Sequence, residues 1–184
     1  MDEKRLVNQI RNNDTKASRR FASHYSKKVY KLAFHLTSNQ QDAEDITQEV
    51  MIKAIRSLLE FEGRSTLTTW LYRITVNTYL GELRKNHTNR ITTDMELDSR
   101  PNQEPLPDEQ VQNSEIGKRI ENAVNSLSPT QRTVFVLKYF KQLKIDEIAE
   151  IVQIKPGTVK SHLYRAVEQL QHKLGDLYKV YNRE

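Results

Sequence analysis

Four carboxylates lie within eight residues in the segment DAEDITQE (42–49) of a chain whose formal net charge is +5: Asp42, Glu44, Asp45 and Glu49. Such a cluster could bind a metal ion or act in general acid–base catalysis if a lysine or histidine met it in a pocket. No histidine partners it, and the five histidines of the chain show no metal-ligand spacing. There is also no cysteine and no glycine-rich phosphate loop. We therefore predict no catalytic residues, no metal and no cofactor, and the carboxylates need another explanation.

A second polar group has the spacing of a DNA-reading helix. Lys160, Ser161, Tyr164 and Arg165 fall on one helical face, and these side chains can bond base edges or pack on sugar and thymine methyl groups. Thr158 and the preceding turn are expected to offer backbone amides to a phosphate. The face lies on the second of two expected helices, about 145–152 and 156–174, which have the proportions of a helix-turn-helix. The alternative is an ordinary helical hairpin with a solvated basic face.

The expected helix-turn-helix contains two unusual residues. Position 153, where the backbone favours φ > 0 and Gly is common, is Gln, at a cost of roughly 1 kcal/mol. In the second helix, His162 stands where a cation is common. Apolar residues are expected between the two helices, with small Ala149 at their crossing: Ile148, Val152, Ile154 and Val159.

Apolar spacings of three and four predict further helices before this motif. They cover about 17–36, about 43–58 and about 66–85, and the second is expected to start at Ser38 as N-cap with Gln41 completing a capping box. In the third, Leu67, Trp70, Leu71 and Ile74 are expected to face inward, whereas Tyr72 is the candidate for an exposed aromatic. Another stripe comprises Ile116, Ile120, Val124 and Leu127; Ser128 and Pro129 then start a helix carrying Val134, Phe135, Leu137 and Tyr139.

Charge divides the chain into three parts. Residues 1–90 hold 16 Lys and Arg against 10 Asp and Glu, 91–113 hold 1 against 6, and 114–184 hold 12 against 8. The middle part contains three of the five prolines and no aromatic residue, so it cannot bury enough surface to fold alone. We therefore predict an all-α protein of two small helical domains, 1–90 and 114–184, joined by a flexible acidic linker, 91–113. Basic domains suggest a polyanionic partner such as nucleic acid.

Two motifs together resemble a known family. DAEDITQEVMIKAIRSL with FEGRSTLTTWLYRITVN, followed by LSPTQRTVFVLKYFKQLKIDEIAEIV and GTVKSHLYRA, resembles the extracytoplasmic-function (ECF) sigma factors of bacterial RNA polymerase. The resemblance covers nearly all of residues 17–174 and implies sigma regions 2 and 4 with no region 3 between them. It implies an alternative-type sigma factor that binds core polymerase, recognises the −10 and −35 promoter elements and helps promoter melting.

The resemblance also implies roles for individual residues. Thr158, Lys160, Ser161, Tyr164 and Arg165 would contact the −35 element. The −10 element would be bound by Phe61, Glu62, Gly63, Arg64, Ser65, Thr69, Arg73, Asn77 and Arg84, with an unstacked base held in the loop 61–65. The polymerase would be contacted by Asp42, Asp45, Gln48 and Glu49, which are expected to dock on the clamp of the largest subunit; the second-largest subunit and an anti-sigma factor are further implied partners. Leu67, where an aromatic is usual, and Gly81, commonly acidic, depart from the family pattern.

Two alternatives belong to other classes. A stand-alone helix-turn-helix regulator would explain residues 143–174 but not the first ninety. An adaptor bound to polymerase would need DAEDITQE but not Lys160 or Arg165. The N-terminal residues have no signal-like apolar run and no stretch is long enough to span a membrane, so we expect a cytoplasmic protein without membrane insertion.

Overall fold

The computed structural model describes residues 2–92 and 115–181, with side chains for 2–86 and 115–175, and these residues form helices and no strand. The chain divides into two compact units, Met1–Arg100 and Pro101–Glu184. This confirms the predicted all-α class. The division falls within the predicted linker, of which 93–113 lie outside the described residues, and the exact domain bounds stay predictions.

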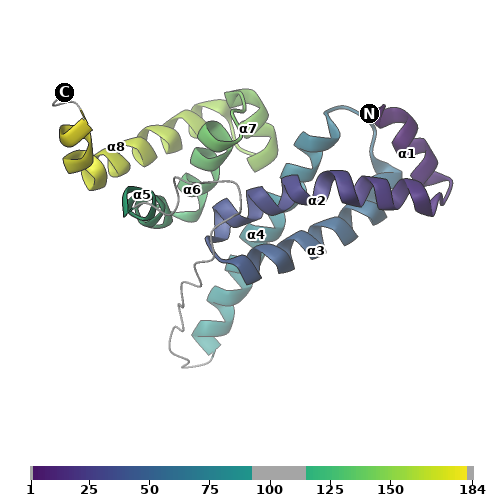
Figure 1. Cartoon of the computed structure of the whole chain (residues 1–184), viewed down its shortest axis with the longest axis horizontal. Helices are drawn as coiled ribbons and strands as arrows, with labels where there is room; N and C mark the ends of the chain where they lie inside the picture. The colour runs from purple at the N-terminus through teal and green to yellow at the C-terminus, as the bar shows by residue number, and fades with distance from the viewer. Residues whose placement is uncertain (1, 93–114, 182–184) are drawn as a thin grey trace. The chain divides into compact units, whose positions relative to one another are not determined.

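Within its described residues, 2–92, the first unit contains four α-helices and one short 3-10 helix (Figure 1). They are α1 (Glu3–Arg11), α2 (Thr15–Thr37), α3 (Gln40–Ser57), η1 (Leu58–Glu60) and α4 (Leu67–Thr92). Figure 1 shows α2 and α3 running side by side, and both also pack on α4. The predicted helices are therefore confirmed, although α4 continues through the first two residues of the predicted linker. The helix α1 was not predicted.

The core of the first unit follows the predicted periodicity. Each fully buried large side chain contributes about 1.5–3 kcal/mol of transfer free energy. Residues of α2 supply most of the largest ones: Phe21, Tyr25, Val29, Leu32 and Leu36. From α3, Ala43, Ile46, Val50 and Ala54 face the same core. The expectation that Trp70 belongs to the core is confirmed, since it is buried together with Leu67 and Leu71.

Two predictions in this unit were wrong. Ser38 does not start α3: it ends α2 in the left-handed conformation (φ 51°), and its N–H donates to Phe34 O. Asn39 is the N-cap instead, with its side chain accepting from Asp42 N at 3.0 Å. A two-residue connection leaves room for one terminating and one initiating residue, so the cap shifts to Asn39, which caps at least as well as Ser. Tyr72 is buried rather than exposed, because α4 packs against both α2 and α3.

The second unit contains α5 (Glu115–Asn125), α6 (Pro129–Phe135), a π-helix η2 (Val136–Phe140), α7 (Ile145–Val152) and α8 (Pro156–Tyr181). Ser128 is the N-cap of α6 and Pro129 is its first residue, as predicted, and Gln131 completes a capping box with Ser128. The core includes Ala123, Val124, Leu127, Ala166 and Leu170, with Phe135 and Leu174 packed against it.

The apolar stripe of α5 is only partly buried. Val124 and Leu127 lie in the core as predicted, whereas Ile116 and Ile120 remain 40% and 39% exposed. Only the last part of α5 therefore packs against Ala166 and Leu170 of α8. Tyr139 is also exposed, since the widened turn of η2 interrupts the helix that was predicted to continue through it.

Candidate functional site

The acidic segment DAEDITQE forms the first half of α3. Ala43 and Ile46 are buried against the rest of the first unit, which leaves Asp42, Asp45 and Gln48 exposed and Glu49 half-exposed. Partial burial, and then the charge of Asp45, raise the pKa of the Asp42 carboxyl above its ordinary value. The four side chains predicted to contact a partner therefore share the outer face of one helix, with polar groups that face solvent.

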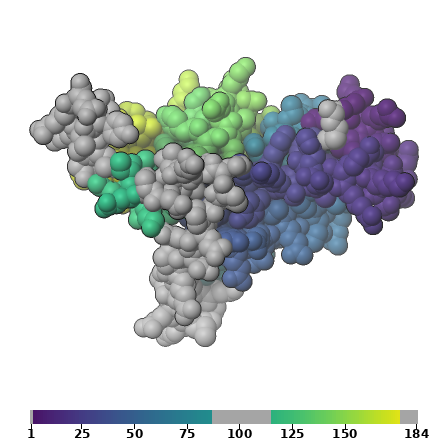
Figure 2. All heavy atoms as spheres, in the orientation of Figure 1, coloured from purple at the N-terminus to yellow at the C-terminus, as the bar shows by residue number. Residues whose placement is uncertain are grey.

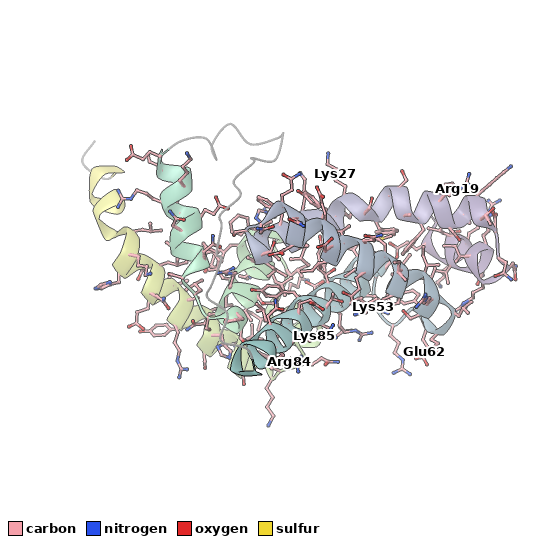
Figure 3. All side chains as sticks on the ribbon, turned by 90° about the horizontal axis from the view of Figure 1, so that it is seen from below. Arg19, Lys27, Lys53, Glu62, Arg84 and Lys85 are labelled. Carbon is pink, nitrogen blue, oxygen red and sulfur yellow. The ribbon has the colours of Figure 1, made fainter. Side chains whose placement is uncertain are left out.

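Glu49 differs from the other three because it already has a partner within the chain. Its Oε1 lies 2.6 Å from Lys53 Nζ, and Lys53 Nζ also donates to Thr78 Oγ1 of α4 at 3.2 Å. Lys85 of α4 lies near the same group: the hydrogen bond that its Nζ donates to Glu82, the charge of Glu82, and then the charge of Glu49 raise the pKa of Lys85. Figure 3 shows Lys53 and Lys85 on the side of the unit formed by α3 and α4.

Glu44, the fourth carboxylate of the segment, points to a different neighbour. Its Oε1 accepts from Gln40 Nε2 at 3.0 Å, and its charge, after burial, raises the pKa of Tyr30 on α2. In the part of the chain that the structure describes, no three His, Asp or Glu side chains are placed to hold a metal ion. Glu44 thus lies away from the face that Asp42, Asp45 and Glu49 share.

The loop 61–66 connects η1 to α4 and is exposed at its tip. Gly63 has φ +72°, a left-handed conformation that L side chains rarely adopt, and an added Cβ would meet nothing within 4 Å. Glu62 and Arg64 flank it, with side chains 63% and 85% exposed and an ion pair of 2.5 Å between them. Ser65, at the end of the predicted base-holding loop, is half-buried. Phe61 anchors the start of the loop, where its ring packs on Trp70 at 5.2 Å between centroids.

The predicted DNA face of α4 emerges gradually from the core. Thr69 is buried, and its hydroxyl lies 3.0 Å from that of Thr66, whose oxygen accepts from Thr69 N at the start of the helix. Arg73 is half-buried, whereas Asn77 and Arg84 are exposed. Arg84 Nε donates to Leu80 O at 3.1 Å, and Figure 3 places its side chain on the α3–α4 side with Lys85. Thr66 therefore caps the helix, and the buried side chain of Thr69 packs against this cap instead of facing solvent.

The helix-turn-helix is formed by α7 and α8. Gln153 has φ 59°, as predicted for this turn, and its N–H donates to Ala149 O. Ile148, Ala149 and Val159 are buried between the helices, whereas Val152 and Ile154 are half-buried. The short turn holds α8 with its outer face uncovered by α7.

The outer face of α8 carries the predicted base-reading side chains. Lys160, Ser161, Tyr164 and Arg165 are all exposed, Tyr164 to 70%. Ser161 Oγ donates to Gly157 O at 3.0 Å, so its oxygen remains an acceptor. The amide of Thr158 donates to Lys155 O at 2.9 Å, so the expected phosphate contact from that amide meets competition within the turn, while the side chain is exposed.

The helix α1 and its contacts with the loop 61–66 were not predicted from the sequence. Arg11 Nη2 donates to Phe61 O at 2.7 Å, and Glu3 Oε2 accepts from Leu67 N at 3.2 Å. An amphipathic signal for α1 exists, since Asp2 is an N-cap and Leu6, Val7 and Ile10 are buried at spacings of one and three. Contacts that join residues 50 and 64 positions apart have no local signal.

Each of the two units matches a known protein family. Residues 21–88 match the family described as Sigma-70 region 2, and residues 117–170 match Sigma-70, region 4. The matches coincide with the unit that carries DAEDITQE and the loop 61–66, and with the unit that carries the helix-turn-helix. The fold and its exposed faces thus define a protein of the sigma-70 class.

Full-length relatives define the subgroup. The chain is 32% identical over 185 residues to the ECF RNA polymerase sigma factor SigW of Bacillus subtilis (strain 168), covering 95% of this chain and 97% of that protein. It is 30% identical to the ECF RNA polymerase sigma-E factor of Haemophilus influenzae, over 96% of this chain and 97% of that one. The chain belongs to the ECF RNA polymerase sigma factors. The alternative of a stand-alone regulator is not favoured, because it leaves the region 2 match unexplained.

A solved structure has the same fold. The sigma factor RpoE of Bartonella quintana, in a co-crystal with the anti-sigma factor NepR, gives a TM-score of 0.74 at 25% identity, covering 85% of this chain and 96% of that one. None of the helices that the structure describes here combines the length and apolar character that a bilayer crossing requires.

Proposed function

We propose that this protein recruits core RNA polymerase to promoters, with α3 as the polymerase contact, the loop 61–65 and α4 as readers of the −10 element, and α8 as the reader of the −35 element. Catalysis remains with the polymerase, and the protein works in the cytoplasm. An anti-sigma factor is a further partner of the kind found with the sigma factor of similar structure.

The observation that carries the proposal is the exposed base-reading face of α8. Val159, Leu163 and Ala166 bury one side of the helix. The opposite side presents an ammonium, a hydroxyl, a phenol and a guanidinium at one-turn spacing: Lys160, Ser161, Tyr164 and Arg165. These are groups that bond guanine edges, contact phosphates and pack on thymine methyl groups in the major groove.

The loop 61–65 and α4 support promoter opening in the same proposal. An unpaired base must be held outside the stack, which costs a few kcal/mol per base unless the protein contacts it. The tip of the loop offers backbone at Gly63 that is not covered by side chains, together with the charged groups of Glu62 and Arg64. Asn77 can form paired hydrogen bonds with a base, and Arg73 and Arg84 can contact phosphates. The buried hydroxyl of Thr69 contributes indirectly, through its hydrogen bond with Thr66, which caps α4.

The acidic face has a protein partner in this proposal. The carboxylates of Asp42, Asp45 and Glu49 would be repelled by a DNA backbone, so the face that they form with Gln48 suits a basic polymerase clamp instead. The apparent conflict between an acidic segment and a basic chain then disappears, because the two charges serve different partners.

Transcription by a reconstituted holoenzyme tests the proposal. Start sites mapped after overexpression supply promoters for run-off assays with purified core enzyme and this protein. We expect start-site-specific transcripts that require both, and weak duplex binding by the protein alone. A protein that neither binds core enzyme nor directs transcription from any mapped start site would refute the proposal.

A matched pair of variants tests the role of α8. Lys160→Ala removes a cation from the outer face, and Lys173→Ala removes one from an exposed position further along the same helix. If Lys160 binds a phosphate, its removal lowers holoenzyme affinity for the promoter and reduces the salt slope by about 1, whereas removal of a base-reading group costs about 1–3 kcal/mol. Equal behaviour of the two variants would argue against the assigned face.

A further inference from the structure

The loop 61–66 is held at both ends by the helix α1. Arg11 at the end of α1 donates from Nη2 to Phe61 O at 2.7 Å, where the loop begins. Glu3 at the start of α1 accepts at Oε2 from Leu67 N at 3.2 Å, where the loop ends and α4 begins. The nine-residue helix α1 thus fixes the positions of both ends of the loop.

The position of Glu3 is itself fixed by a third helix. Its Oε1 accepts from the Tyr25 hydroxyl of α2 at 2.9 Å, and burial, then the hydrogen bond and charge of Glu3, raise the pKa of Tyr25. The carboxylate therefore joins α1, α2 and α4, and it lies at the N-terminus of α4, where a negative charge complements the helix dipole. Buried Leu6, Val7 and Ile10 hold α1 in place, and Figure 2 shows its dark purple atoms covering one end of the unit.

The loop has little to determine its shape between those points. Among the described residues, Glu62 and Arg64 pair with each other and are largely exposed, and exposed pairs contribute little to stability. Gly63 makes no side-chain contact and adopts a conformation that favours Gly. At the ends of the loop, Phe61 packs on Trp70 and donates its N–H to Leu58 O, and Thr66 is hydrogen-bonded to Thr69. The contacts from α1 are the restraints that tie both ends to another helix.

We propose that α1 is a positioning element for promoter opening: Arg11 and Glu3 hold the loop 61–66 in the shape that receives an unpaired base. This inference rests on the proposed function of the loop, and it extends that function to residues before the start of the region 2 match at residue 21. A loop that is already ordered loses less conformational entropy when it binds the unpaired base, so its binding free energy is more favourable. Removal of these hydrogen bonds therefore weakens binding of the base without removing any group that touches DNA.

The first experiment measures the loop without polymerase or DNA. Amide hydrogen exchange of residues 62–66, and trypsin cleavage after exposed Arg64, are followed in wild type, Arg11→Ala and Glu3→Ala. We expect both rates to rise roughly threefold to tenfold, since each variant removes a charge-assisted hydrogen bond. Arg5→Ala is the matched control, because Arg5 is exposed on the same helix six residues earlier. Arg11→Lys restores a donor for Phe61 O and should return the rates toward wild type.

The second experiment measures opening and core binding separately. With core enzyme, Arg11→Ala and Glu3→Ala should lower open-complex formation on duplex promoter roughly threefold to tenfold, and Arg11→Lys should recover most of it. Affinity for core enzyme and for a −35 duplex within the holoenzyme should stay within twofold, because α3 and α8 are unchanged. A merely structural role for α1 would lower all three readouts together.

The outcomes separate this inference from the proposed function. If wild type directs transcription but the exchange of 62–66 is equal in Arg11→Ala and Arg5→Ala, α1 does not hold the loop and the inference is wrong. Faster exchange with unchanged open-complex formation also overturns it. If wild type fails to direct any transcription, the proposed function fails, whatever the exchange experiment gives.

Discussion

Reversal of the charge at Asp45 is the sharpest test of the acidic face. Asp45 is exposed on α3 and faces away from the buried Ala43 and Ile46. Asp45→Lys loses an interaction with the helix dipole that is small beyond the first turn, but it removes the repulsion that, after burial, raises the pKa of Asp42. These effects oppose each other, so we expect the melting temperature to fall by less than about 3 °C.

The same change should have a large effect on the polymerase complex. A lysine placed against a basic clamp exchanges attraction for repulsion, which costs several kcal/mol across a docked interface. At a cost of about 3 kcal/mol, core affinity falls by about 100-fold. The chain has no cysteine, so one introduced cysteine at exposed Ser23 of α2 accepts a single fluorophore for anisotropy titrations with core enzyme.

Two further charge reversals calibrate this result. Glu44→Lys changes the net charge equally but lies toward Gln40 and Tyr30, so we expect core affinity within threefold of wild type. Glu49→Lys is a less selective probe, because it replaces the ion pair with Lys53 by a repulsion and destabilises the fold by about 1 kcal/mol. Core affinity of Asp45→Lys within threefold of wild type, or an equal reduction in Glu44→Lys, would refute a specific acidic docking face.

Three predictions concern stability. Gly81→Ala should stabilise the first unit by about 1 kcal/mol in chemical denaturation, because the new methyl group meets nothing within 4 Å and Ala favours the helix; an unchanged midpoint would contradict this. Gln153→Gly should stabilise the second unit by roughly 1 kcal/mol, since φ 59° strains a residue with a Cβ, and a lower melting temperature would be evidence against strain at this turn. Tyr25 has a raised pKa in the fold, so its contribution is complete below the ordinary value of 10.0 and is lost as the pH rises above it. In thermal melts, the melting temperature of Tyr25→Phe should therefore fall less between pH 9 and about pH 11 than that of wild type. An equal fall of the two melting temperatures with pH would speak against the Glu3 contact.

Periodicity in the sequence predicts the helices that bury one face. In α2 a single apolar stripe faces the core, and the burial of Phe21, Tyr25 and Val29 follows from their spacing alone. The outer face of α8 is predictable for the same reason, because one buried side at Val159 and Leu163 leaves the opposite side exposed. Both cases depend on the sequence within one helix.

The predicted exposure of side chains was wrong in α4, which packs against several other helices. The helix α4 contacts α2 and α3, so Tyr72, Thr75, Val76 and Tyr79 are buried in addition to the predicted stripe. Buried threonines resemble surface residues in sequence; in the structure, Thr75 Oγ1 donates to Leu71 O. The burial of Thr69 and Tyr72 therefore follows from tertiary packing that a single helical stripe does not encode.

The contacts of α1 with the loop also impose an order on biosynthesis. Ribosomes make the chain from its N-terminus, so Glu3 and Arg11 emerge well before their partners Leu67 and Phe61, which follow 64 and 50 positions later. During that interval α1 can pack only on what has already emerged, and an isolated helix of nine residues is marginal in water. The helix α1 is thus made before its partners but fixed only after them, so the loop acquires its shape only when the first unit is complete.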